Sequence, residues 1–277
     1  MIALQLAIIA LALVLPDSVV AATNKTPLFT DGLAPHFNKD ISNIPHPKTD
    51  SRHNGVPVPQ ACKDHAKDAK CDVSKVTARR VKYDDCEDPW VLCRCDDANM
   101  SMDTLELRWA KVPTGIRSYT GAILAVKASG CSGLNYGGQF IAFSGDCDDT
   151  VFLHEAGHSL DAGFSGEQRW TGAVNNSSCV PDDYSNASPA ENWTQNNVIV
   201  TWAKHYGGWP KVLAKNSEAG CLKPQFDVIN NDKRIKTAQN AKKCLRNNVR
   251  RLQTSTLTNR RLSAATLRLL LRMAMSR

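Results

Sequence analysis

The stretch VFLHEAGHSLDAG, residues 151–163, places His154 and His158 four residues apart, with Glu155 directly after the first histidine. In an α-helix, residues i and i+4 project from the same face one turn apart, so both imidazoles can reach one ion. Glu155 then flanks the position of a water held by that ion. H-E-x-x-H on a helix is the arrangement in which two histidines bind zinc and the glutamate acts as general base. The motif therefore predicts a catalytic zinc site.

The residues around the motif favour a helix. Apolar residues 151–153 fill the preceding turn, Thr150 is a candidate N-cap, and Gly163 is typical of the position just beyond a helix C-terminus. The alternative is two surface histidines at this spacing by coincidence. The chain holds only seven histidines and six glutamates, so a chance match is rare. We expect a helix that starts near residues 149–150 and ends at Gly163.

A catalytic zinc needs a third protein ligand and one open position. In H-E-x-x-H-x-x-G-x-x-H proteins the last histidine is that ligand, but here the glycine and histidine positions hold Asp161 and Phe164, which excludes the metzincin class. Asp161 shares the face of His154, yet it lies about 7 Å along the axis from the midpoint of the histidines. We expect it to orient His158 through the other ring nitrogen. Direct ligation and simple capping are the alternatives.

Glu191 is the main candidate for the third ligand. It stands in DDYSNASPAENWTQ, residues 182–195, near the start of a second expected helix from residue 188 or 189 to about residue 205. A glutamate from a second helix is the gluzincin solution, and Trp193 could anchor that helix in the core. The alternative is that Glu191 only favours the positive end of its helix. Tyr184, seven residues earlier, either stabilises the oxyanion of a tetrahedral intermediate or packs in the core.

The N-terminus and the cysteines indicate a secreted, extracellular protein. Residues 2–15 form an apolar run of signal-peptide length, and residues 20–22 offer small side chains for cleavage, so residues 1–22 are a predicted signal peptide. A membrane anchor is the alternative, but Pro16 and Asp17 end the run before it could span a bilayer. Ten cysteines follow, which in this context indicates up to five disulfides. Cys93 and Cys95 are too close for a comfortable mutual bridge, so each should pair elsewhere.

Sequons for N-glycosylation fit a secreted surface. They begin at Asn24, Asn99, Asn175, Asn176, Asn186 and Asn192.

The formal charge of +7 does not describe the main part of the chain. From Lys233 onward there are 13 Lys/Arg and no acidic residue, which leaves 21 basic and 27 acidic residues before it, a net charge of −6. We therefore expect no nucleic-acid partner. In the tail, Arg261, Arg268 and Arg272 fall on one helical face, the pattern of a basic amphipathic helix that could lie on an anionic membrane. A disordered tail or a mis-assigned C-terminus is the favoured alternative.

The chain divides by composition into four parts. After the signal, residues 23–60 lack cysteine and periodicity and are expected to form an irregular arm or propeptide. Residues 61–244 are the expected disulfide-rich domain, and residues 245–277 the basic tail. Residues 104–111, 121–126 and 138–144 are expected to be strands. The predicted fold class is α+β: a zincin-like domain with a small mixed sheet and an active-site helix, stapled by disulfides and monomeric.

Three blocks resemble a known family. DDCEDPWVLCRCDDA (84–98), HEAGHSLD (154–161) and DYSNASPAENWTQ (183–195) are similar in order and spacing to the fungal conidiation-specific protein 13 group, secreted proteins proposed to be metallopeptidases. The likeness covers roughly residues 62–221. A tyrosine and a glutamate seven apart supply the transition-state donor and third zinc ligand in the anthrax lethal factor peptidase domain, a more distant likeness. By position, the resemblance implies these roles for Tyr184 and Glu191.

The last block departs from the family pattern at Ser185, Asn192 and Trp193. The sequon at Asn192 stands beside the proposed ligand, where a glycan would crowd the cleft. The resulting hypothesis is a zinc-dependent metalloendopeptidase in which Glu155 takes the proton of a zinc-bound water that attacks a peptide carbonyl. The alternative is an inactive zinc-binding, spore-surface or effector protein of the same fold.

Overall fold

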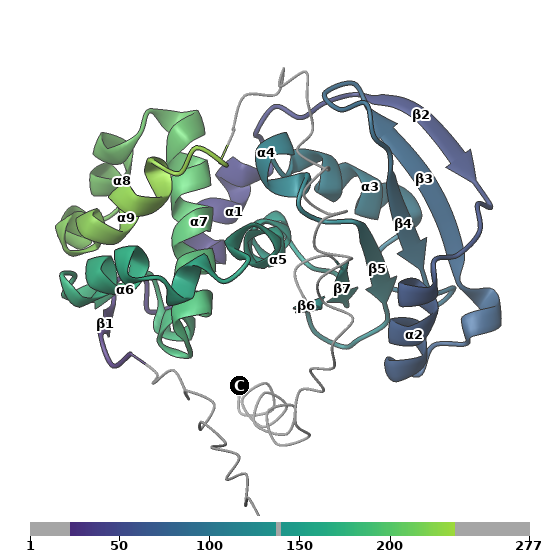
Figure 1. Ribbon diagram of the computed structural model, residues 1–277, viewed down its shortest axis with the longest axis horizontal. Coiled ribbons are helices and arrows are strands. Elements are labelled where there is room, and N and C mark those ends of the chain that lie inside the picture. The colour runs from purple at the N-terminus through teal and green to yellow at the C-terminus, as the bar shows by residue number, and fades with distance from the viewer. Residues whose placement is uncertain (1–22, 137–139, 236–277) are drawn as a thin grey trace, which may run out of the picture.

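The computed structural model describes residues 23–136 and 140–235, and they form a sheet-containing half and a helical half on either side of helix α5 (Asp149–Asp161) (Figure 1). The α+β class is therefore confirmed. The predicted signal peptide, the tail 245–277 and Cys244 lie outside the described residues. Among the described residues, no helix combines the length and apolar character that crossing a bilayer requires.

A mixed sheet of six strands is the main β-structure. Its strands in spatial order are β2 (Thr49–Asn54), β3 (Thr77–Tyr83), β4 (Trp90–Arg94), β5 (Ala122–Val126), β7 (Phe140–Ser144) and β6 (Ser132–Tyr136). The three strands β4, β5 and β7 are parallel, whereas β2, β3 and β6 pair antiparallel with their neighbours. The strands predicted at 121–126 and 138–144 correspond to β5 and β7. Strand β6 is the sheet edge on the side of α5.

The described residues also contain nine α-helices and four 3₁₀ helices. The helices other than α5 are α1 (Ala34–Ile41), α2 (Gln60–Asp68), α3 (Met102–Lys111), α4 (Thr114–Arg117), α6 (Gln168–Asn175), α7 (Pro189–Tyr206), α8 (Trp209–Lys215) and α9 (Lys223–Asn230). The 3₁₀ helices are η1 (Val73–Lys75), η2 (Phe164–Gly166), η3 (Asp183–Asn186) and η4 (Ser217–Leu222).

Helices cover both faces of the sheet. Because successive side chains of a strand point to opposite faces, one strand can contact a helix on each side. Phe143 of β7 stacks on Phe152 of α5 with ring centroids 3.9 Å apart. Phe140, on the opposite face of β7, stacks on His65 of α2. A disulfide from Cys62 of α2 to Cys93 of β4 joins α2 to the sheet.

Four disulfides join pairs of described cysteines. They are Cys62–Cys93, Cys71–Cys95, Cys131–Cys147 and Cys179–Cys221. The expectation that Cys93 and Cys95 pair elsewhere is confirmed.

The strand predicted for residues 104–111 is wrong, since this segment belongs to helix α3. The Ser101 hydroxyl accepts a hydrogen bond from the backbone N–H of Thr104 and so caps the helix. Leu105 and Trp109, four residues apart, are both fully buried. The apolar residues thus follow a helical stripe, which the apparent alternation of the segment concealed.

The irregular arm predicted for residues 23–60 is also wrong. It forms β1 (Thr26–Pro27), α1 and β2, and β1 pairs in parallel with β8 (Cys179–Val180). Phe29, Leu33, Phe37 and Ile41 are all buried in the core. Helix α1 packs against α5 and α7. This segment is therefore part of the fold, because its few apolar side chains recur every four residues and reach the core together.

Candidate metal centre

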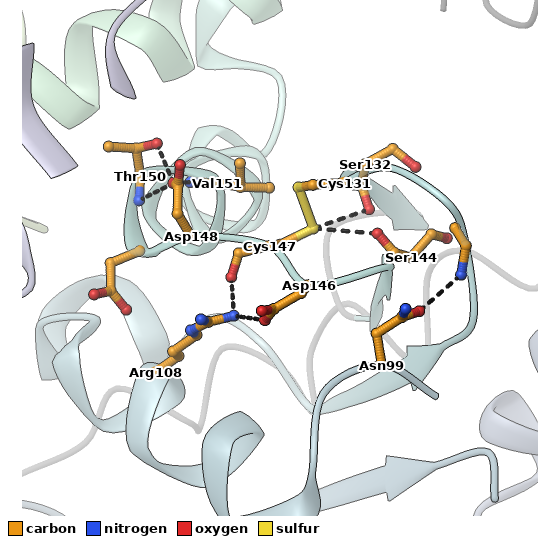
Figure 2. Close-up of a disulfide and its surroundings, with 12 residues drawn as sticks. Asn99, Arg108, Cys131, Ser132, Ser144, Asp146, Cys147, Asp148, Thr150 and Val151 are labelled. Carbon is orange, nitrogen blue, oxygen red and sulfur yellow. Dashed lines mark hydrogen bonds and ion pairs between the residues drawn. A yellow bond between two sulfur atoms is a disulfide. The ribbon is translucent and has the colours of Figure 1, made fainter. Parts of the chain in front are cut away.

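Helix α5 carries the His-Glu-His motif and is fixed at both ends. The Asp148 carboxylate caps its N-terminus by accepting hydrogen bonds from the backbone N–H groups of Thr150 and Val151, so Asp148 and not Thr150 is the N-cap. Ala162 and Gly163, both with positive φ, end the helix where the sequence predicted. Figure 2 shows that the Cys131–Cys147 disulfide ties this N-terminus to the segment that leads into β6.

Helix α7 brings Glu191 towards the motif. The Ser188 hydroxyl accepts a hydrogen bond from the backbone N–H of Glu191 at 3.1 Å, which starts the helix where it was expected. The two helices pack closely because Gly157 has no side chain: a Cβ there would lie 3.1 Å from Asn197 Nδ2 and 3.2 Å from Thr194 Cγ2. Trp193 is fully buried and anchors α7 as predicted.

The two histidines and Glu191 converge on one point. Glu191 Oε2 lies 3.0 Å from His154 Nε2 and 3.2 Å from His158 Nε2, and the two imidazole nitrogens are 3.2 Å apart. Bonds of about 2.0–2.1 Å to a tetrahedral zinc would separate neighbouring ligand atoms by about 3.3 Å. Among the described residues, this is the one cluster of three or more His, Cys, Asp or Glu side chains with the spacing of metal ligands. The donor set and its spacing therefore fit zinc.

The electrostatics of the cluster favour a cation. Burial opposes a charge on His154, but the carboxylates of Glu191 and Glu155 outweigh it and raise the pKa of His154 to about 9. Desolvation opposes a charge on Glu191 too, yet the two imidazoles hold the pKa of its carboxyl well below the usual range. A site that stabilises a proton between these groups also stabilises a metal ion in its place.

Glu155 lies beside the cluster and is almost entirely buried, with 5 % of its surface exposed. Burial raises the pKa of its carboxyl, although the neighbouring imidazoles act in the opposite direction. Its Oε2 has no hydrogen-bond partner among the described residues. A buried carboxylate with a raised pKa and a free oxygen can accept a proton from a nearby water.

Tyr184, on η3, lies next to the cluster. Its ring centroid is 5.6 Å from that of His154, and 46 % of the residue is exposed, which argues against the core-packing alternative. Partial burial, together with the charges of Glu191 and Glu155, raises the pKa of the Tyr184 phenol. The hydroxyl therefore stays protonated and can act as a hydrogen-bond donor.

Asp161 does not join the cluster of candidate ligands. Its carboxylate accepts hydrogen bonds from the backbone N–H and the hydroxyl of Ser165, at 2.6 and 2.7 Å. None of the hydrogen bonds of Asp161 or of His158 joins these two residues, so the predicted orienting contact is not formed. Asp161 instead holds the turn after α5, which corresponds to the capping alternative.

The group that contacts the second ring nitrogen of His154 was not among the residues predicted from the sequence. The ring Nδ1 of His154 lies 3.1 Å from Gln195 Oε1, and Gln195 Nε2 donates to the buried Asp182 carboxylate at 2.5 Å. Asp182 also caps η3 by accepting from the backbone N–H and hydroxyl of Ser185. One carboxylate thus links the 3₁₀ helix of Tyr184 to a proposed ligand. Gln195 is four residues after Glu191 on the same helix, a spacing that could have revealed it.

The sequon at Asn192 is buried in the folded chain. Asn192 has no exposed surface, and its Oδ1 accepts a hydrogen bond from Asn196 Nδ2 at 2.9 Å. There is no room for a sugar at this side chain. The crowding of the cleft by a glycan therefore does not arise in the folded protein.

Comparison with known proteins identifies the family. The chain is 33% identical to conidiation-specific protein 13 of Neurospora crassa over 172 residues, a match that covers 57% of this chain and 50% of the relative, so the chain spans about half of that protein's length. No solved structure matches the chain at a significant level. The model of the family "Conidiation-specific protein Con-13" matches residues 36–257. The chain therefore belongs to the Con-13 family.

Proposed function

We propose that this protein is a secreted, zinc-dependent peptide hydrolase of the zincin type. The observation that carries the proposal is the convergence of His154, His158 and Glu191 within 4.8 Å of one another, beside the buried Glu155. The disulfides among the described residues are compatible with an oxidising, extracellular setting.

His154, His158 and Glu191 would hold the ion. When bound, zinc supplies a Lewis acid that lowers the pKa of water and polarises a carbonyl. Glu155 accepts the proton of the attacking water and passes it to the departing amine. The partly exposed Tyr184 phenol beside the cluster donates a hydrogen bond to the developing oxyanion. Gln195 keeps His154 in the tautomer whose Nε2 is free to coordinate.

A zinc-binding protein without turnover is the second candidate. The low exposure of Glu155 favours it, because a general base must reach water and substrate. The hydrolase and the non-catalytic zinc-binding protein would use the same three ligands. They differ only in whether Glu155 is accessible to water and to a bound peptide.

The deciding experiment is digestion of a diverse peptide library by the purified full chain, with and without a chelator, alongside zinc analysis. We expect one zinc per chain and cleavage that the chelator abolishes. A chain that holds zinc and cleaves no peptide favours the second candidate. A chain that does not bind zinc contradicts both candidate functions.

A further inference from the structure

The edge strand β6 presents two different faces. Tyr136 stacks on His65 of α2, with ring centroids 3.5 Å apart, so its side of the strand faces α2. Gly133 and Asn135 are on the other side because side chains alternate along a strand. Asn135 Nδ2 donates to the backbone carbonyl of Glu155 at 2.9 Å and to Ser159 Oγ at 2.8 Å, which places this second face against α5.

Gly133 lies directly against the Glu155 side chain. A Cβ built on Gly133 would lie 2.5 Å from Glu155 Oε1 and 2.6 Å from Cδ, and it would also collide with Cγ. Ordinary contacts between heavy atoms of this kind are about 3.5–4.0 Å. The Glu155 side chain therefore occupies the space that any other residue at position 133 would fill.

Backbone conformation does not explain the glycine. Six described glycines have positive φ, and Gly133 is not among them. It is a regular strand residue paired with Phe143 of β7. An L-amino acid could adopt its conformation without strain, so the requirement at position 133 is for space.

Strand β6 is also held in place relative to α5. The Cys131–Cys147 disulfide joins the residue before β6 to the loop that enters α5 (Figure 2). Arg108 of α3 donates to the Asp146 carboxylate and to the Cys147 carbonyl on the same loop. With the Asn135 hydrogen bonds at its other end, the strand cannot easily move away from Glu155.

We propose that Gly133 is a positioning residue for the Glu155 side chain: the bare backbone of β6 forms the wall that keeps this carboxylate beside the His154, His158 and Glu191 cluster. The catalytic meaning of this wall rests on the proposed function. The contact itself is independent of any activity.

A double-mutant cycle tests the contact through thermal stability. In the metal-free protein, Gly133→Ala should lower Tm by about 2–4 °C. In a Glu155→Ala background the same substitution should cost little, since the colliding atoms are gone. Gly130→Ala is the matched control, because a Cβ there meets nothing within 4 Å. It should leave Tm unchanged in both backgrounds. A Gly133→Ala effect of equal size with and without Glu155 would overturn the proposal.

Zinc binding and kinetics give the second readout. Gly133→Ala should bind zinc as the wild type does, because it touches none of the three ligands, and should lower kcat about a hundred-fold with KM little changed. Gly133→Ala/Glu155→Asp, with a shorter carboxylate, should recover part of the lost stability. If wild-type protein cleaves no peptide, the proposed function fails and the stability cycle alone decides the role of Gly133. Full activity in a stably folded Gly133→Ala protein contradicts the positioning role.

Discussion

The side-chain oxygen of Gln195 lies 3.1 Å from Nδ1 of His154, so the other ring nitrogen, Nε2, is the one that faces His158 and Glu191. An amide oxygen can only accept a hydrogen bond, so Nδ1 carries a proton, and in the neutral ring Nε2 is left with a free lone pair. The amide is itself oriented by its donation to Asp182. Partners of this kind raise the basicity of a ligating histidine and fix its ring.

Replacing Gln195 by alanine should therefore weaken zinc binding about 10–100-fold while the fold persists. Competition with a chromogenic chelator measures the affinity. Gln168→Ala, at an exposed position of α6, is the control and should bind as the wild type does. Unchanged affinity in Gln195→Ala would show that the contact does not orient the ligand.

Glu155→Gln should separate binding from turnover. The amide keeps the shape of the side chain but cannot accept the proton of the attacking water, so kcat should fall by about 10²–10⁴. Zinc content should stay at the wild-type level, since Glu155 is not among the proposed ligands. Metal analysis and a peptide-hydrolysis assay on the same preparation check the zinc content and kcat. Loss of zinc from this variant would assign Glu155 to the coordination sphere.

Glu191→Ala should abolish tight zinc binding. It removes the only carboxylate of the cluster and leaves two imidazoles from one helix, which is one ligand too few for a catalytic zinc site. Glu167→Gln removes a carboxylate at an exposed position and serves as the control. Isothermal titration with zinc should show binding only in the control. Tight binding by Glu191→Ala would mean that another donor completes the site.

The pH dependence of zinc binding and of metal-free stability should run in opposite directions. The pKa of His154 is raised to about 9 in the folded, metal-free protein, above its unfolded value of about 6.5. Its stabilising charge is therefore complete below about pH 6.5 and is lost as the pH rises through about 9. Zinc requires the neutral ring, so apparent affinity should increase by about tenfold per pH unit up to about pH 9. Affinity that is constant over this range contradicts the assignment of His154.

Asn192 should carry no glycan in the folded, secreted protein, because it has no exposed surface. Asn186 should also remain unglycosylated, since its side-chain amide accepts a hydrogen bond from the backbone N–H of Lys25 and donates one to the Lys25 carbonyl. The exposed Asn24, Asn99, Asn175 and Asn176 remain available. Mass spectrometry of glycopeptides from a secreting host checks this pattern. A glycan at Asn192 would mean that the first turns of α7 are built differently.

The helix of the motif and the helix of Glu191 could be predicted because each has local signals. The spacing of the histidines in α5 and the serine and proline at the start of α7 need no knowledge of distant contacts. In α3, by contrast, a short apolar pattern fitted both a strand and a helix, and the cap at Ser101 decided for the helix. The arm was misjudged from its polar composition, although Leu33, Phe37 and Ile41 recur at helical spacing.

The surroundings of Glu155 could not be predicted in this way. Gly133 and Glu155 are 22 positions apart in the sequence, and they meet only because β6 folds back to the edge of the sheet beyond β7. Strand order of this kind depends on long-range pairing, which a single sequence does not display. The hydrogen bonds of Asn135 belong to the same class of contact.

The buried apolar side chains of residues 23–60 bear on how a hydrolase of this fold could be activated. Many secreted hydrolases are made as zymogens whose leading segment is cut away to open the active site. Here that segment supplies Phe37 to the core, an edge strand to the main sheet and a pairing strand beside Cys179. Cutting it out would remove the fully buried Phe37 side chain from the core, a loss of about 3–5 kcal/mol for that side chain alone. Any maturation step must therefore leave these residues in place.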